Sequence, residues 1–215
     1  MNAVRVGIVA SLLLCVWLAW PKGESSTPPR PLLIKSALKD AKDPIVVLGD
    51  SIVRQAQLPR ALCKRPVINA GIDGSTTSSG LDGMLKKAIG DKKAALIVVS
   101  LGMNDAETAD SVESYRKNYT ALLTALKTMT SRLALVAITP LEIGKPEVGH
   151  RTPQSIDGYN GALPDIAREA GASVIALPPM PAGFTSDGVH LNASGAAIWN
   201  KAISDGITGT LCPNG

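Results

Sequence analysis

The stretch "IVVLGDSIVRQ", residues 45–55, decides the fold class of this chain. Its apolar run from Ile45 to Leu48 is bounded by Pro44 and Gly49, which predicts a buried strand, and the pattern then turns polar and helix-like. Asp50 and Ser51 stand at the junction. Both residue types are common helix N-caps, so the pair can simply begin a helix. The alternative is chemical, because open α/β sheets build their sites at the carboxyl ends of strands.

Further strand-like runs alternate with helical patterns along the rest of the chain. We expect strands at Ile45–Gly49, 66–69, 94–101, 133–139 and 173–177, and helices at 79–90, 111–130, 157–171 and 192–207. This alternation predicts one parallel sheet with helices on both faces. Residues 140–155, rich in Gly and Pro, are expected to form a mobile surface loop.

Length, composition and charge indicate one globular α/β domain. The chain has 215 residues, of which 45% are hydrophobic and 19% are charged. Two of its four net positive charges come from Arg5 and Lys22, because residues 1–22 contain no acidic residue. The remainder is nearly neutral and lacks the clustered basic face of a nucleic-acid-binding protein, so we expect no nucleic-acid partner.

The N-terminal segment predicts export. Residues 6–20, "VGIVASLLLCVWLAW", form an apolar run that suits a signal peptide but is short for a membrane span. No small-residue cleavage site follows, and Trp17 and Trp20 suit an anchor at a membrane interface. Cys15 adds a lipoprotein alternative, although Leu14 stands where a small residue is usual. All three alternatives place the domain outside the cytoplasm, periplasmic or extracellular, and two of them keep it at the membrane.

The expected domain organisation follows from these boundaries. It comprises residues 1–22 as signal peptide or membrane anchor, 23–40 as a Pro/Ser-rich tether and 41–215 as the folded domain. Outside the leader the chain has only Cys63 and Cys212. In an exported domain the two are expected to form a disulfide, whereas in a reducing compartment they would remain thiols.

Polar clusters follow the second and third predicted strands as well. "NAGIDGSTT", residues 69–77, offers Gly71 and Gly74 for a tight turn whose backbone N–H groups face outward. Asn104 and Asp105 follow the strand at 94–101. Either cluster alone is also what an ordinary strand-to-helix turn contains.

The segment "SDGVHLNASG", residues 186–195, is the most specific of these signals. His190 lies three residues after Asp187, just before the last predicted helix. A carboxylate at this spacing can hold an imidazole in the tautomer that accepts a proton from a serine. The only other histidine, His150, has no carboxylate so placed and is expected to be solvated.

In order, "GDS", a glycine after the second strand, "GMND" and "DGVH" resemble the four sequence blocks of the SGNH (GDSL-type) hydrolase family, over residues 44–195. The resemblance implies an α/β fold, a flavodoxin-like three-layer α/β/α sandwich, here with a five-stranded parallel sheet. It also implies site roles, which are Ser51 as nucleophile, Asp187 and His190 completing a triad, and Ser51, Gly74 and Asn104 as oxyanion-hole donors. Gly71 is the alternative to Gly74, Asp50 is expected to be structural, and neither a cofactor nor a metal is expected.

The expected function is therefore that of a serine esterase acting on a short, acetyl-like ester of a small molecule or a cell-surface glycan. Outside the leader there are five aromatic residues, Tyr115, Tyr119, Tyr159, Phe184 and Trp199, and of these only Phe184 is placed to border the site. That leaves little apolar surface for a long acyl chain. The alternatives are a polysaccharide O-acetyltransferase on the same triad, a lipase or thioesterase, and a non-catalytic exported binding module.

Overall fold

The computed structural model describes residues 29–213, and its centre is a six-stranded sheet. The strands are β1 (Ile45–Gly49), β2 (Ala61–Leu62), β3 (Arg65–Gly71), β4 (Leu96–Ser100), β5 (Leu133–Val136) and β6 (Ser173–Ile175). Their order across the sheet is β2-β3-β1-β4-β5-β6, and every pair is parallel except β2 with β3. The five predicted parallel strands are present, and β2 is an additional edge strand.

The sequence did not predict strand β2, because its hairpin lacks the usual turn residues. The two residues between β2 and β3, Cys63 and Lys64, have φ angles of 49° and 59°. Two-residue hairpins with positive φ at both positions normally use Asn-Gly or Asp-Gly. A two-residue strand is also too short to produce a period-two pattern.

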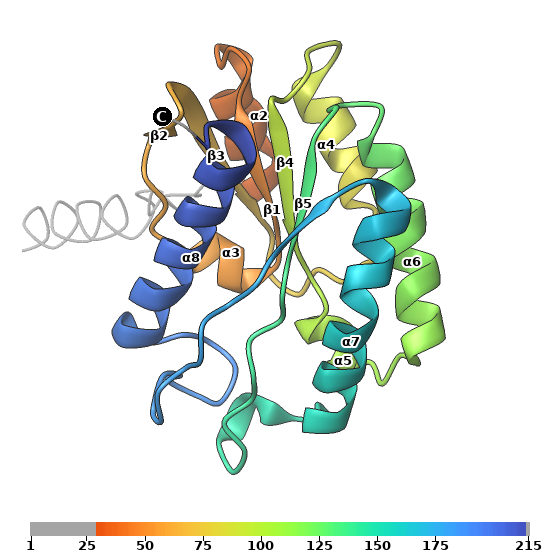
Figure 1. Ribbon diagram of the computed structural model, residues 1–215, viewed down its shortest axis with the longest axis vertical. Helices are drawn as coiled ribbons and strands as arrows, with labels where there is room; N and C mark the ends of the chain where they lie inside the picture. The colour runs from red at the N-terminus through yellow and green to blue at the C-terminus, as the bar shows by residue number, and fades with distance from the viewer. Residues whose placement is uncertain (1–28, 214–215) are drawn as a thin grey trace, which may run out of the picture.

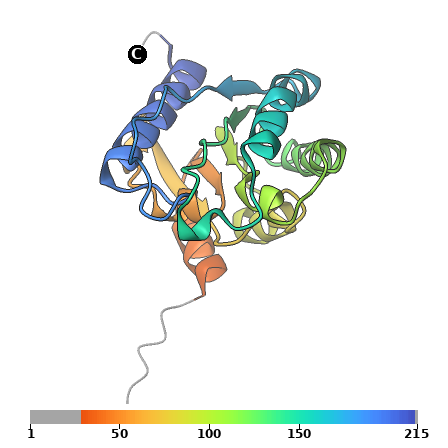
Figure 2. The ribbon, with the colours of Figure 1, turned by 90° about the horizontal axis from the view of Figure 1, so that it is seen from below.

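Helices cover both faces of the sheet and form the outer layers (Figures 1 and 2). They are α2 (Arg30–Lys39), α3 (Ser51–Gln55), α4 (Leu81–Ile89), α5 (Met103–Glu107), α6 (Val112–Leu126), α7 (Pro153–Ala170) and α8 (Ala193–Leu211), with a 3₁₀ turn at Pro146–Val148. Helix α2 packs on α4 and α6 packs on α7 on one face, whereas α8 and the short α3 lie on the other (Figure 1). This is the three-layer α/β/α arrangement expected from the sequence.

The sheet register brings three strand ends to one edge. All five residues of β1 are buried, because β3 and β4 flank the strand and helices cover both its faces, and this explains its unbroken apolar run. Gly49 at the end of β1 pairs with Gly71 of β3 and with Ser100 of β4. The segments that follow these strands therefore start side by side, towards the bottom of Figure 1, where α3 and α5 lie.

Helix α2 corrects the expected domain boundary at residue 41. The second half of the expected tether 23–40 is helical, and its residues Ile34 and Leu38 are buried against the domain. Arg30, at the start of the helix, donates hydrogen bonds to the backbone oxygens of Asn69 (2.9 Å) and Gly71 (3.0 Å). The folded unit thus includes residues from about position 30 onward.

The predicted disulfide between Cys63 and Cys212 is confirmed. It joins the β2–β3 hairpin to the residue that follows α8, across 149 positions of sequence, with a Cα–Cα distance of 6.0 Å. The expected signal peptide or anchor at residues 1–22 lies outside the described residues. Among the helices described, none combines the length and the apolar character needed to cross a bilayer.

Candidate active site

Ser51 begins helix α3 directly after the central strand β1. Its neighbour Asp50 is the N-cap of that helix and accepts a hydrogen bond from the backbone N–H of Ile52 at 2.9 Å. The Asp50 side chain is 2% exposed, and this burial raises its pKa to about 7, although the N–H of Ile52 and the nearby His190 act in the opposite direction. Asp50 therefore has the structural role expected from the sequence.

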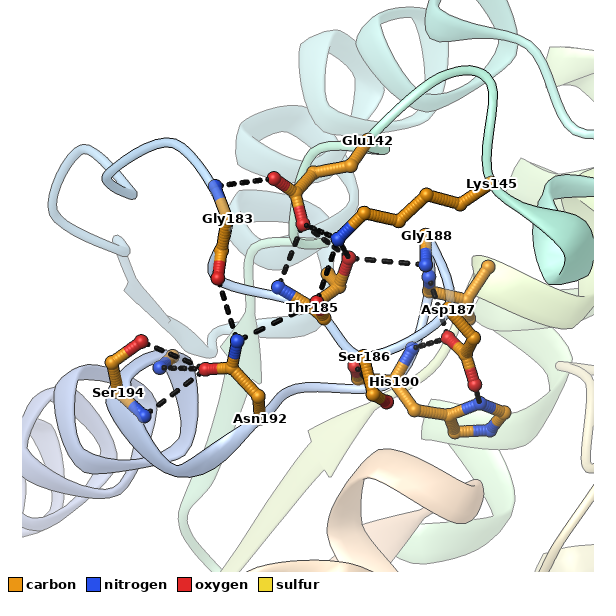
Figure 3. Close-up of polar contacts among 12 residues, drawn as sticks. Glu142, Lys145, Gly183, Thr185, Ser186, Asp187, Gly188, His190, Asn192 and Ser194 are labelled. Carbon is orange, nitrogen blue, oxygen red and sulfur yellow. Dashed lines mark hydrogen bonds and ion pairs between the residues drawn. The ribbon is translucent and has the colours of Figure 1, made fainter.

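Ser51, His190 and Asp187 form one hydrogen-bonded chain. The Ser51 Oγ lies 3.0 Å from Nε2 of His190, and the His190 Nδ1 lies 2.7 Å from Oδ2 of Asp187. The other Asp187 oxygen accepts from the backbone N–H groups of Val189 (3.0 Å) and His190 (2.7 Å), as Figure 3 shows for Asp187 and His190. A serine, an imidazole and a carboxylate linked in this order can activate the serine as a nucleophile.

The environment of Asp187 favours its ionised form. Partial burial by itself would raise the pKa of this carboxyl, but its hydrogen bonds with His190 and Val189 outweigh burial and hold the pKa below its ordinary value. An ionised Asp187 accepts a hydrogen bond from the protonated Nδ1 of His190. That tautomer leaves Nε2 free to accept the proton of Ser51.

The two candidate glycines after β3 differ in what surrounds them. A Cβ on Gly71 would lie 2.2 Å from the backbone nitrogen of Arg54 in α3, so Gly71 allows β3 and α3 to approach closely. Its own N–H donates to the side-chain oxygen of Asn69 at 3.1 Å. Gly74 is exposed, has a φ of +70°, and its N–H has no partner among the described residues. Of the two, Gly74 keeps a free donor.

Asn104 lies in helix α5, after β4. Its side-chain nitrogen donates to the backbone oxygen of Ser75 (3.1 Å), in the segment just after Gly74. Its side-chain oxygen accepts from Arg151 at 3.1 Å. One hydrogen of the Asn104 amide has no partner within residues 29–213, and the backbone N–H of Ser51 has none there either. Ser51, Gly74 and Asn104 thus retain unused N–H donors.

Asp105 is a buried carboxylate that links two of the loops at the site. It is 0% exposed and accepts hydrogen bonds from both the backbone N–H (3.0 Å) and the hydroxyl of Thr77. Burial raises its pKa, and the hydrogen bonds from Thr77 partly oppose this rise. In the sequence Asp105 is one of the polar residues that an ordinary strand-to-helix turn contains, whereas the structure uses it to tie α5 to the segment after β3.

Residues 140–155 were expected to form a mobile surface loop, but residues 153–155 begin α7. The segment at 140–152 braces the loop that contains Asp187 and His190 (Figure 3). The Glu142 carboxylate accepts from the backbone N–H of Gly183 (2.6 Å), the backbone N–H of Thr185 (2.7 Å), the hydroxyl of Thr185 and the ammonium of Lys145 (2.8 Å). Lys145 also donates to the backbone oxygen of Thr185 at 2.7 Å. The hydrogen bonds from Lys145 and Thr185 lower the pKa of Glu142 to about 2.

Backbone contacts extend this brace to Asp187 itself. The N–H of Glu142 donates to the oxygen of Gly188, and the N–H of Glu147 donates to the oxygen of Asp187, each at 3.1 Å. No sequence signal identified Glu142, Lys145 or Arg151, because charged residues in an irregular stretch ordinarily indicate a solvated loop.

Two expectations for single residues have different outcomes. His150 is exposed, as expected, and among the described residues only its backbone N–H makes a hydrogen bond, to the carboxylate of Glu107. Phe184 was expected to border the site, but it offers almost no surface there. Its side chain is buried, with 4% exposed, so it presents almost no surface to a substrate.

A pocket of about 250 Å³ lies between α3 and α8, and its lining includes Ile52 and Leu191 but none of Ser51, Asp187 and His190. Within residues 29–213 no group of three or more His, Cys, Asp or Glu side chains is placed to hold a metal ion.

Comparisons with known proteins place the chain in a family. The model of the GDSL-like Lipase/Acylhydrolase family matches residues 47–198, which span every site residue described above. The search of curated proteins found no match.

Solved structures resemble the fold at low sequence identity. A structure from Streptococcus pneumonia, named as a platelet activating factor, is 20% identical in sequence with a TM-score of 0.70. The match covers 96% of this chain and 100% of that structure's chain. A lipase/acylhydrolase from Enterococcus faecalis is 23% identical, with a TM-score of 0.65 and coverage of 81% and 100%. The acetylxylan esterase Axe2 from Geobacillus stearothermophilus is 18% identical, with a TM-score of 0.58 and coverage of 78% and 94%. At these identities the likeness concerns the fold.

Proposed function

Since the chain belongs to the GDSL-like Lipase/Acylhydrolase family and is thus a hydrolase of ester bonds, we propose that it is a serine esterase that removes acetyl or similarly short acyl groups. The hydrogen-bonded chain from Ser51 through His190 to Asp187 supports the serine mechanism. In two further structures of the Axe2 esterase, a serine and a histidine substitution are named as catalytic mutants of that enzyme.

In the first step, the Ser51 Oγ attacks the carbonyl carbon of the ester and passes its proton to Nε2 of His190. Asp187, hydrogen-bonded to Nδ1, stabilises the imidazolium that forms. When the tetrahedral intermediate collapses, the bond from the carbonyl carbon to the alcohol oxygen breaks, and that oxygen takes the proton from Nε2. The acyl group remains on Oγ.

Water completes the cycle by the same route. His190 accepts a proton from water as the water oxygen attacks the acyl carbon. His190 then returns this proton to the Ser51 Oγ when the carboxylic acid leaves. In both steps the negative oxygen is held by the N–H groups of Ser51 and Gly74 and by the amide of Asn104. Each donor of this kind contributes about 3 kcal/mol to lowering the barrier.

One observation carries the short-acyl part of the proposal. All five aromatic side chains outside the leader are at most 4% exposed, namely Tyr115, Tyr119, Tyr159, Phe184 and Trp199. None is therefore available to line a groove for an alkyl chain. On the segment at 140–152, Ile143 is the one exposed large apolar side chain.

A series of p-nitrophenyl esters from acetate to palmitate tests the proposal on the purified chain. We expect kcat/KM to be highest for acetate, since burial of each CH₂ in an alkyl groove would add about 0.8 kcal/mol that this site lacks. A maximum at octanoate or longer would replace this proposal with a lipase or thioesterase function. Acetate release from acetylated oligosaccharides, measured in parallel, asks whether a glycan ester is hydrolysed.

Active-site variants test the mechanism in the same assay. We expect Ser51→Ala and His190→Ala each to remove nearly all activity and the double variant to be scarcely worse, because the two residues act as a unit. Ser36→Ala, on the exposed side of α2, serves as the matched control and should keep full activity. Turnover near the wild-type rate in Ser51→Ala would refute the nucleophile assignment.

We further propose that the domain acts outside the cytoplasm and is held at the membrane by residues 6–20. The apolar run and its lack of a cleavage site support this, as does a disulfide, which persists in oxidising compartments. Cell fractionation should recover the full-length chain with membranes, accessible to protease added from the non-cytoplasmic side. A full-length chain recovered in the cytoplasmic fraction would contradict the proposal.

A further inference from the structure

Arg151 is a nearly buried cation one residue before the N-cap of α7. Its side chain is only 10% exposed, which is rare for arginine unless its donors are paired. The Nε donates to the backbone oxygen of Met103 (2.9 Å), and Nη1 donates to the carboxylate of Glu107 (2.9 Å) and the backbone oxygen of Glu147 (2.8 Å). The remaining nitrogen, Nη2, donates to the side-chain oxygen of Asn104 at 3.1 Å.

These contacts determine which way the Asn104 amide faces. A guanidinium has no acceptor, so the Asn104 atom that faces Arg151 has to be the oxygen. A backbone carbonyl has no donor, so the atom that faces Ser75 has to be the nitrogen. The two ends of the amide are thus assigned by chemistry, although oxygen and nitrogen look alike in shape. A rotation by 180° would set the NH₂ group against the guanidinium and the oxygen against a carbonyl.

We propose that Arg151 is a positioning residue that holds and polarises Asn104 as a hydrogen-bond donor to the oxyanion. The inference rests on the proposed function, in which Asn104 is one of the three donors. The positively charged guanidinium, hydrogen-bonded to the Asn104 oxygen, draws electron density from the amide nitrogen. This strengthens the remaining N–H of Asn104 as a donor. Because the amide is held before substrate arrives, it does not have to reorient when the negative charge develops.

The geometry requires arginine rather than any cation. The planar guanidinium reaches Met103, Glu107 and Asn104 at the same time, because its donors point in fixed, divergent directions. A lysine ammonium is a single point on a flexible stem and cannot serve these three acceptors together. Arg151→Lys thus retains the charge while disturbing the arrangement.

A double-mutant cycle on the full chain, with p-nitrophenyl acetate as substrate, tests the proposal. We expect Asn104→Ala to lower kcat by about 10²- to 10³-fold, as for the loss of one oxyanion donor. Arg151→Met should lower kcat by about 10- to 100-fold while KM changes by less than about threefold, because Asn104 donates to the oxyanion only in the transition state. In the Asn104→Ala background, Arg151→Met should change kcat by less than about threefold.

A merely structural role of Arg151 gives a different pattern. If Arg151→Met lowers kcat by the same factor with and without Asn104, the two residues act independently and the proposal is overturned. Wild-type kcat in Arg151→Met overturns it as well. Arg116→Met is the matched control, since Arg116 pairs with Asp165 and Glu169 on the surface, and it should retain wild-type kcat.

Should Arg151→Met fail to fold, Arg151→Lys takes its place in the cycle. We expect it to lose at least about threefold in kcat, and this loss should vanish in the Asn104→Ala background. Failure of the proposed function looks different. It would appear as full activity in Ser51→Ala or in Asn104→Ala, whereas an active wild type, an inactive Ser51→Ala and an additive cycle refute the role of Arg151 alone.

Discussion

At the scale of single residues, Asp50 shows how the nucleophile is positioned. Its carboxyl group is buried beside Ser51 and caps α3 through the N–H of Ile52, so it fixes the start of the helix that presents the serine. Burial raises its pKa from 3.8 to about 7. The folded protein therefore retains a proton on Asp50 at pH values where the unfolded chain has released it.

This pKa predicts the direction of a pH dependence. The folded-state pKa lies above the unfolded one, so the stabilising contribution of Asp50 is complete below about pH 4 and is lost as the pH rises towards 7. Within that window the loss approaches about 1.4 kcal/mol per pH unit. Asp50→Asn cannot titrate, so the stability of the wild type relative to this variant should fall between pH 4 and 7 and then level off.

Urea unfolding of both proteins at half-unit pH steps measures this difference. Asp91→Asn, at a fully exposed position, is the control and should follow the wild-type curve. A difference between wild type and Asp50→Asn that stays constant across the window would show that Asp50 does not retain its proton in the folded state.

At the scale of elements, the brace formed by Glu142, Lys145 and Thr185 holds the Asp187–His190 loop in place. The triad needs this support, because the loop follows β6 at the edge of the sheet and has no regular secondary structure between residues 176 and 192. A small displacement of the imidazole lengthens its hydrogen bond to Ser51. Displacements of about 1 Å can cost on the order of 100-fold in rate.

We expect Glu142→Gln to lower kcat by about tenfold and to accelerate amide hydrogen exchange over residues 183–190. The variant removes the charge that pairs with Lys145 and that receives three donors from Gly183 and Thr185. Exchange mass spectrometry and ester hydrolysis measure the two effects. Glu147→Gln is the matched control in the same segment, because the Glu147 side chain is exposed and has no polar partner among the described residues. Amide hydrogen exchange over residues 183–190 at the wild-type rate in Glu142→Gln would show that Glu142 does not hold this loop in place.

Acid should release the same brace. The pKa of Glu142 is lowered from 4.5 to about 2, so its stabilising contribution is complete above about pH 4.5 and is lost as the pH falls through about 2. The exchange difference between wild type and Glu142→Gln should therefore persist at pH 4.5 and shrink towards pH 2.

At the scale of the whole molecule, the disulfide joins two segments that lie 149 positions apart in the sequence. Cys63 lies in the edge hairpin, whereas Cys212 follows α8, the long helix that covers one face of the sheet. The hairpin stands at the amino end of β3, which is the end opposite to Gly49, Gly71 and the site. The bond can therefore contribute to stability without taking part in the chemistry.

We expect reduction of the disulfide to lower the free energy of unfolding by about 4 kcal/mol, because the unfolded chain loses the closure of a long loop. Urea unfolding of the oxidised and reduced protein measures this change, and kcat at 25 °C should stay the same. The double variant Cys63→Ser with Cys212→Ser should reproduce the reduced protein. Equal urea midpoints for the oxidised and reduced forms would show that the bond does not restrict the unfolded chain.

The sequence by itself determined the parallel sheet. It also predicted the disulfide for an exported domain and, through the family resemblance, the three residues of the hydrogen-bonded chain. Strand β1 was predicted with its observed bounds, because a strand buried on both faces has to be apolar throughout. Asp187 and His190 were identifiable because they lie in one short segment, and the spacing between them is a local property of the chain.

Only the tertiary structure decided the contacts between loops. Arg151 meets Asn104 across 47 positions, and Glu142 meets Thr185 across 43, in segments without periodicity. Periodic patterns report which face of an element is buried, but they say nothing about which loops the sheet brings to one edge. The same limit applies to α2, since Ile34 and Leu38 are its only buried residues. The partners that orient Asn104 and brace His190 are set by the sheet register and the crossover connections, and these exist only once the chain has folded.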